Sequence, residues 1–143
     1  MAKTYELTPA RRVVNRLMKT LIRLGFGPSN TVLLTVQGRK SGKLYSTPVS
    51  LVQENGQRWL VAPYGPVSWV QNARAAGQVT LTRGKQSESV SLQELSPEES
   101  APILKLYVKQ EAITRPYFDA QPDSPIEAFV AEAARHPVFL IRP

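Results

Sequence analysis

The chain has 143 residues, 42% of them apolar, and carries 18 Lys and Arg against 11 Asp and Glu, a formal net charge of +7. This length suits one hydrophobic core, so we expect a single domain over residues 1–143. No cysteine occurs and His136 is the only histidine, which excludes disulfides, thiol catalysis and Cys- or His-rich metal sites; no metal is expected. A secretory signal and an apolar run of the ~20 residues needed to span a bilayer are both lacking, so we expect a soluble, cytoplasmic protein.

An amphipathic helix is predicted over residues 8–25, where apolar residues recur at helical spacing with cations between them. Thr8 is a suitable N-cap, Pro9 suits the first helical position and Gly25 suits the end. A basic amphipathic helix can make peripheral contact with an anionic membrane. More often such a helix packs its apolar stripe on its own domain, and we expect that packing here.

Six strands are expected, most of them joined as consecutive hairpins. Apolar and β-branched runs place them at residues 31–36, 44–52, 58–62, 79–82, 87–95 and 137–141. Asn55-Gly56 is the strongest hairpin signal and precedes the third strand. Pro48 cannot donate a hydrogen bond to a neighbouring strand, so its strand should be bulged or at an edge there.

Three further helices are predicted from serine followed by Gln or Glu three residues later. The pairs are Ser68 with Gln71, Ser96 with Glu99, and Ser124 with Glu127. Together with the strands they indicate an α+β fold, a six-stranded antiparallel β-barrel with flanking helices. Side chains fill the interior of so small a barrel, so a cofactor has to lie on its surface or in a cleft with a partner, which favours a homodimer.

Residues 38–43, Gly-Arg-Lys-Ser-Gly-Lys, form a candidate anion site. Glycine lets backbone N–H groups approach an oxyanion, and Arg and Lys donate charge-assisted hydrogen bonds to phosphate or carboxylate. A solvated basic hairpin tip is the other interpretation of the same residues. The N–H groups at the start of the helix at Ser68 offer a second anion site, although Trp69 is the kind of residue more often found in a core.

Ordinary catalytic groups are scarce in this sequence. His136 is expected to be a polar residue at a helix end, favoured there by the helix dipole, rather than a general base. The carboxylates are expected mostly at caps or on helix surfaces. If the chain is an enzyme, a cofactor should therefore carry the difficult step.

The sequence resembles the deazaflavin-dependent nitroreductase family, flavin/deazaflavin oxidoreductases with an FMN-binding-like split β-barrel. The resemblance rests on the order of a basic helix, Gly38-Arg39-Lys40-Ser41-Gly42-Lys43, Thr47-Pro48-Val49 and Trp69-x-x-Asn72, and it extends from about Leu17 to the C-terminus. It implies an oxidoreductase that transfers a hydride from reduced coenzyme F-420, an 8-hydroxy-5-deazaflavin with an acidic tail, to a small-molecule electron acceptor.

The resemblance also assigns residues. Arg39, Lys40 and Ser41 would hold the tail, and Tyr45, Ser46, Thr47, Pro48, Val49 and Ser50 would line the ring. Ala62, Pro63, Tyr64 and Gly65 would contact ring or phosphate, and Ser68, Trp69 and Asn72 would complete the coenzyme site. The resemblance places Tyr117 near the substrate, and Tyr64, Tyr117 or water could donate the proton that accompanies hydride transfer; Tyr64 and Tyr117 are the candidate catalytic residues.

Two positions depart from the family pattern. Tyr45 stands where many relatives have arginine. Pro63-Tyr64-Gly65 replaces the Ser-Lys-Gly-Gly loop of the nitroimidazole-reducing members, which favours an activated alkene such as an enone, coumarin-type lactone or quinone as substrate.

Two other interpretations stay open at this stage. The same barrel could bind FMN, haem or lipid, and the positive charge would also suit a nucleic-acid-binding module. The cations are distributed over a helix, a turn and the tails, not in a stripe interleaved with aromatic residues, so no nucleic-acid partner is expected.

Overall fold

The computed structural model describes residues 2, 8–26 and 30–143. The elements in chain order are α1 (Pro9–Arg23), β1 (Thr31–Gln37), β2 (Leu44–Glu54), β3 (Gln57–Val61), α2 (Ser68–Ala76), β4 (Gln78–Arg83), β5 (Gln86–Glu94), α3 (Pro97–Gln110), the 3-10 helix η1 (Ala112–Tyr117), α4 (Ile126–Glu132), the 3-10 helix η2 (Ala133–Arg135) and β6 (Val138–Arg142). Within the described residues, no helix is both long and apolar enough to cross a membrane.

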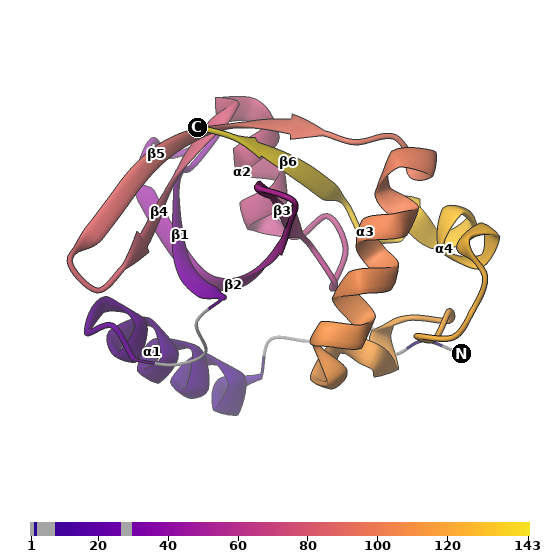
Figure 1. The fold of residues 1–143 in the computed structure, drawn as a ribbon. Helices are drawn as coiled ribbons and strands as arrows, with labels where there is room; N and C mark the ends of the chain where they lie inside the picture. The colour runs from indigo at the N-terminus through magenta and orange to yellow at the C-terminus, as the bar shows by residue number, and fades with distance from the viewer. Residues whose placement is uncertain (1, 3–7, 27–29) are drawn as a thin grey trace.

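The six strands close into an antiparallel barrel in the order β1-β2-β3-β6-β5-β4 (Figure 1). β6 completes the barrel by pairing with β3 on one side and β5 on the other. Alternate strand residues point inward, and the interior is filled by apolar side chains that include Leu34, Leu60, Leu81 and Phe139. The predicted α+β fold with a six-stranded split barrel is confirmed, and the outer wall is left for a ligand.

β2 has a second neighbouring strand over only part of its length. Residues 44–50 pair with β1, but pairing with β3 begins at Leu51. Pro48 lies opposite Leu33 of β1, within the stretch that has one neighbour, which confirms its predicted edge position. We call residues 44–50 the open segment of β2. Because Leu51 points into the barrel, alternation places Ser46, Pro48 and Ser50 on the outer side.

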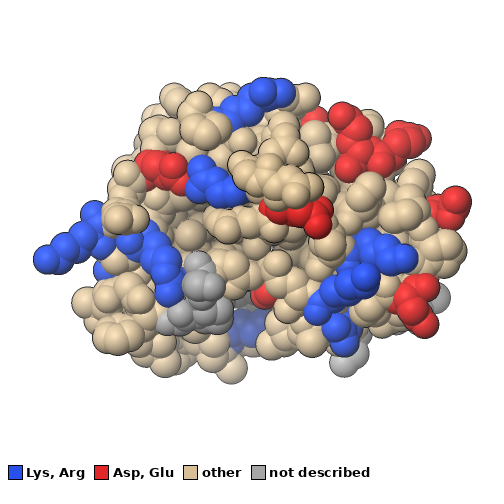
Figure 2. Space-filling model, viewed as in Figure 1, with Lys and Arg blue, Asp and Glu red and all other residues tan. Residues whose placement is uncertain are grey.

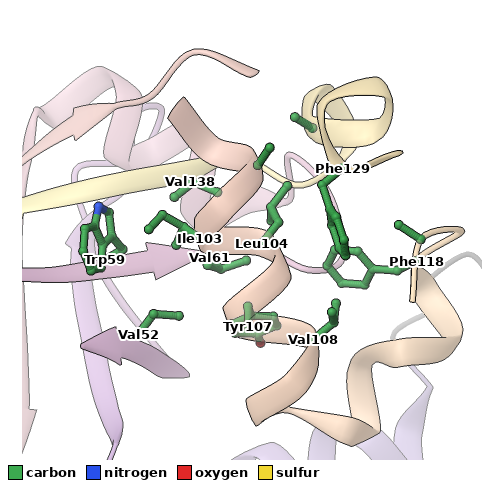
Figure 3. Packing of buried hydrophobic residues seen from close by; sticks show 13 residues of the cluster. Val52, Trp59, Val61, Ile103, Leu104, Tyr107, Val108, Phe118, Phe129 and Val138 are labelled. Carbon is green, nitrogen blue, oxygen red and sulfur yellow. The ribbon is translucent and has the colours of Figure 1, made fainter. Parts of the chain in front are cut away.

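α3 packs on the outer faces of β2, β3 and β6. Figure 3 shows the core between them, with Ile103, Leu104, Tyr107 and Val108 from α3 and Val52, Trp59, Val61 and Val138 from the strands. The predicted capping box starts this helix. Ser96 Oγ accepts from the Glu99 amide at 3.2 Å, and Glu99 Oε1 accepts from the Ser96 amide at 3.1 Å.

The predicted cap of α2 is wrong. The N-cap is Val67, because the chain reverses at Gly65 (φ 94°) and brings the Val67 carbonyl within 3.2 Å of the Gln71 amide. Ser68 is then the first helical residue. The Gln71 side chain donates to the Pro66 carbonyl at 3.1 Å instead of closing a capping box.

The predicted cap of α4 is wrong for a similar reason. Pro125 is the N-cap, and the Ser124 hydroxyl accepts from the Gln121 amide of the preceding turn at 2.8 Å. A serine that already closes the turn before a helix cannot also cap that helix.

α1 begins as predicted, with Thr8 Oγ1 accepting from the Arg11 amide at 3.2 Å, and it lies along β1, β2 and β4. Its orientation differs from the prediction. Ile22 is buried against the barrel, but Val13, Val14 and Leu17 are 57–69% exposed. The expected burial of the apolar stripe is therefore wrong for this part of the helix, because the barrel surface below it is the polar open segment of β2.

Candidate active site

The basic turn between β1 and β2 is closed by its own backbone. The Gly38 amide donates to the Lys43 carbonyl at 2.7 Å, and the Gly42 amide donates to the Gly38 carbonyl at 3.0 Å. Gly42 has φ 72°, a conformation that favours glycine. This closure leaves Arg39 and Lys40 exposed at the tip.

Tyr45 packs against the base of the same turn. Its Oη lies 3.1 Å from Ser41 Oγ, which also accepts from the Lys43 amide at 3.2 Å. A Cβ at position 38 would lie 2.5 Å from Tyr45 Cε2, so a larger residue there would have to displace this ring. Tyr45 therefore supports the turn from one side.

Asn72 of α2 supports the turn from the other side. Its Oδ1 accepts from the Arg39 amide at 3.1 Å and from Arg39 Nη1 at 2.8 Å. Asn72 is 4% exposed, so this acceptor is held inside the protein. The two halves of the sequence motif, the basic turn and Trp-x-x-Asn, are thus in direct contact.

A groove of about 360 Å³ lies between α1 and the open segment of β2. It is lined by Arg12, Asn15, Arg16, Lys19, Ser46 and Thr47. Cations on one wall and hydroxyl groups on the other suit an anionic ligand, and the volume falls within the range of about 300–1,000 Å³ typical of ligand pockets.

Tyr64 and Tyr117 form an aromatic pair beside the first turn of α1. Tyr64 follows β3 and Tyr117 ends η1, yet their ring centroids are 4.8 Å apart with the planes at 77°. Arg11 Nη2 donates to Tyr117 Oη at 2.8 Å. Both candidate proton donors therefore lie in one cluster with a cation.

Glu111, the C-cap of α3, connects α3 to the open segment of β2. Its carboxylate accepts from Ser50 Oγ at 2.9 Å and from Asn30 Nδ2 at 3.3 Å. Burial raises the pKa of nearby Tyr107 far above its ordinary value, and the negative charge of Glu111 and interaction with Tyr64 raise it further. Tyr107 therefore stays protonated.

The model of the F420H(2)-dependent quinone reductase family matches residues 9–133. The chain belongs to this family. It is therefore an F-420-dependent reductase, an oxidoreductase whose cofactor is coenzyme F-420. The family resemblance and the cofactor expected from the sequence are both confirmed.

One similar solved structure is described as an F420-dependent reductase, whereas none of the curated proteins matches the chain. A protein described as a domain-swapped dimer is 26% identical, covering 93% of this chain and 96% of that chain with a TM-score of 0.56. A structure described as an F420-H2 dependent reductase (FDR-A) is 28% identical, covering 80% of this chain and 95% of that chain with a TM-score of 0.56. Atu2129 of Agrobacterium tumefaciens, of unknown function, is 15% identical, covers 95% of this chain and 57% of that chain with a TM-score of 0.60, and is similar in fold alone.

The fold of this F-420-dependent reductase brings most of the predicted site residues to one side of the barrel. The turn holds Arg39, Lys40 and Ser41. The open segment of β2 holds the exposed Tyr45 and the half-buried Ser46, Thr47, Pro48, Val49 and Ser50, and the aromatic pair is Tyr64 and Tyr117.

Other predicted residues have structural partners instead. Trp69 is half-buried with its ring 6.1 Å from that of Phe139, whose side chain belongs to the barrel interior. The Ala62 amide donates to the Pro137 carbonyl at 2.9 Å, and the Gly65 amide donates to the Ala62 carbonyl at 3.3 Å. Ser68 is exposed.

Several residues of the candidate site were not predicted from the sequence. The cations Arg11, Arg12, Arg16 and Lys19 were assigned only to a helix pattern. Ser50 was assigned to the ring by the resemblance, but no motif pairs it with Glu111. Glu132 was expected with the other carboxylates at a cap or on the surface, but it is 2% exposed, so that expectation is wrong for this residue. His136 is also buried, at 3% exposed.

Proposed function

We propose that the protein transfers a hydride from reduced F-420 to a quinone or a related activated alkene, such as an enone or coumarin-type lactone. The observation that carries this proposal is the cationic groove between α1 and the open segment of β2, with the Tyr64–Tyr117 pair near its α1 wall. Membership of the quinone reductase family supports the quinone class. On this proposal residues 1–143 act as one reductase domain.

The acidic tail of the coenzyme would be held by two groups of cations. Arg39 and Lys40 lie at the turn where β2 begins, and Arg12 and Arg16 line the groove farther along β2. Arg and Lys suit the phosphodiester and carboxylates of such a tail because they donate charge-assisted hydrogen bonds. The residues present therefore fit an anionic coenzyme.

The ring would lie on the open segment of β2, with Ser46 and Ser50 on the outer wall of the barrel. Bound there in its reduced form, F-420 would supply a hydride to the acceptor. The protein's own contribution is to hold the acceptor within about 3–3.5 Å of the ring and to exclude water.

The acceptor also needs a proton, because hydride addition to a quinone leaves an oxyanion that becomes a hydroquinone only when protonated. Tyr117 is suited to donate this proton, since accepting a hydrogen bond from Arg11 polarises its own O–H bond. The positive charge of Arg11 would stabilise the oxyanion as it forms. Tyr64, in contact with Tyr117, is the second candidate donor.

Reoxidation of reduced F-420 in the presence of quinones, enones, coumarin-type lactones and nitroaromatics tests the proposal. Quinones are expected to react fastest. Tyr117→Phe should lower kcat about 100-fold, in the range of general acid catalysis, with little change in coenzyme affinity. Ser87→Ala removes an exposed hydroxyl of β5, outside the candidate site, and should leave kcat unchanged. Tight binding of FMN, haem or lipid with no binding of F-420 would refute the proposal.

The outer face of α1 supports a second proposal, contact with an anionic lipid surface. Val13, Val14, Leu17, Leu24 and Phe26 are 57–69% exposed. The helix contains five cations and no acidic residue. In the view of Figure 2, the surface over α1 is largely uncharged, and most of the Asp and Glu residues lie towards α3 and α4. An exposed apolar stripe flanked by cations is typical of helices that lie at a membrane surface.

Flotation of the full chain with vesicles tests this contact. Binding is expected to vesicles that contain anionic lipid and to be lost in Val14→Gln/Leu17→Gln, whereas Ile126→Gln, a control on α4, should still float. A second copy of the chain is the competing occupant, because one similar structure is described as a domain-swapped dimer. A homodimer that depends on Val14 and Leu17, with no vesicle binding, would replace the lipid proposal.

A further inference from the structure

The only histidine of the chain forms a buried pair with Glu132. His136 Nε2 lies 2.8 Å from Glu132 Oε1, and His136 Nδ1 lies 2.8 Å from the Pro63 carbonyl oxygen. The side chains of His136 and Glu132 are 4% and 2% exposed. Desolvating such a pair is costly, and pairs of this kind can often be replaced by apolar residues without loss of stability. Stability alone therefore does not account for this one.

The hydrogen-bond geometry requires the pair to keep one proton between its two members. A carbonyl oxygen only accepts, so Nδ1 must carry a hydrogen that it donates to Pro63. Nε2 then faces a carboxyl group that already accepts from the amides of Asp119 at 3.1 Å and Ala120 at 2.6 Å. A second hydrogen has to lie between Nε2 and Oε1, on the ring or on the carboxyl group, or two acceptors would meet at 2.8 Å.

The charges around this pair are few. Arg135 Nη2 lies 4.0 Å from Glu132 Oε1, but the same guanidinium donates to the exposed Asp119 carboxylate at 2.8 Å. Burial lowers the pKa of the His136 ring, and the hydrogen bonds that the ring makes with the Glu132 carboxyl group and to the Pro63 carbonyl oppose this. The His136 ring is therefore not expected to gain a proton from solvent near neutral pH.

Both loops that carry the active-site tyrosines are attached to this pair. Pro63 directly precedes Tyr64, and Asp119 and Ala120 follow Tyr117. The ring of Phe118, labelled in Figure 3 beside α3, stacks on the ring of His136 with centroids 3.8 Å apart and planes at 18°. The segments before Tyr64 and after Tyr117 thus both contact the pair of side chains Glu132 and His136.

We propose that the Glu132–His136 pair, through its retained proton, is a positioning device that fixes Tyr64 and Tyr117 relative to each other for reduction of the acceptor. This inference rests on the proposed function, because it takes these tyrosines as the acceptor's partners. Neither Glu132 nor His136 is assigned contact with coenzyme or acceptor; both act through the two loops.

NMR of the protein labelled with ¹⁵N-histidine tests the proton directly, since a single ring gives every signal. The Nδ1 proton should be visible in slow exchange with water. The ring signals should stay constant between about pH 6 and pH 8, where a solvent-exposed histidine with a pKa of about 6.5 titrates. Titration centred near that value, with rapid exchange at Nδ1, would overturn the proposal.

Kinetics of three variants test the positioning. His136→Phe keeps a ring against Phe118 but loses both hydrogen bonds, and should lower kcat/KM for the acceptor about tenfold or more, as misplacement of reacting groups does, with F-420 affinity unchanged. Glu132→Gln keeps a hydrogen for Nε2 and an oxygen for the Ala120 amide, but its side-chain nitrogen would face the Asp119 amide, so it should lower kcat/KM by less than His136→Phe does. Val90→Ala, in the barrel interior, is the control for general destabilisation.

The outcomes separate the two proposals. If Tyr117→Phe leaves acceptor reduction unchanged, the assigned role of the tyrosines fails. If Tyr117→Phe is impaired while His136→Phe is no slower than an equally destabilised Val90→Ala, the positioning role fails. Should His136→Phe not fold, a His136 ring that titrates freely near about pH 6.5 in the wild-type protein would overturn the inference.

Discussion

Replacing Asn72 by alanine removes the one acceptor that joins α2 to the basic turn. The hydrogen bond from the Arg39 amide contributes about 1 kcal/mol, and the bond from the exposed guanidinium contributes about 1 kcal/mol or less because the freed group regains water. The free energy of unfolding should therefore fall by about 2 kcal/mol, which lowers Tm by about 6 °C in a chain of this length. Thermal unfolding in the absence of coenzyme measures this loss.

The same substitution should weaken binding of F-420. Without Asn72 the turn would have to become ordered when the coenzyme binds, and this ordering costs part of the binding free energy. A penalty of about 1.4 kcal/mol corresponds to a tenfold rise in Kd, measurable by fluorescence titration. Asn72→Asp keeps Oδ1 and most of the stability, but its negative charge should repel the acidic tail. If Asn72→Ala loses stability yet binds F-420 as tightly as wild type, the reasoning that Asn72 prepares the turn for the coenzyme is refuted.

Three further results are expected. Gly38→Ala should displace the Tyr45 ring, because its Cβ would lie 2.5 Å from Cε2, and should raise the Kd for F-420 about tenfold in the same titration. Lys40→Ala should weaken F-420 binding by roughly 1.5–3 kcal/mol, and by less at high salt, as measured by calorimetry at two ionic strengths. Hydrogen bonds with the Ser96 amide and then with the Ser96 side chain lower the pKa of Glu99 below its ordinary value of 4.5. The stabilisation is therefore present above pH 4.5 and is lost as the pH falls through the lower pKa of the folded state. Glu99→Gln should flatten the dependence of the free energy of unfolding on pH in this range, as measured by urea unfolding.

Local signals predicted the elements of the fold well because each acts within a few residues. Asn55 (φ 53°) and Gly56 (φ 77°) adopt the left-handed conformations that a two-residue hairpin turn requires. The capping box at Ser96 also needs nothing beyond its own helix. The caps of α2 and α4 depended instead on how the preceding turn reverses the chain, which adjacent residues do not specify.

The candidate site was predicted only in part because its components meet through tertiary structure. The periodicity of α1 reveals two faces of the helix but not which face meets the barrel. That choice followed from the polar outer side of β2, where Ser46 lines the groove. The four-residue spacing of Glu132 and His136 is visible in the sequence, but their burial depends on the distant Pro63 carbonyl and the amide of Ala120.

The open segment of β2 also affects how the protein associates with other chains. An unpaired strand edge is a template on which another polypeptide can add a strand, the first step of many aggregation processes. Pro48 sits in the middle of this stretch and has no N–H to offer an incoming chain. The open segment of β2 can thus stay accessible to a flat small molecule while resisting addition of a β-strand from another chain.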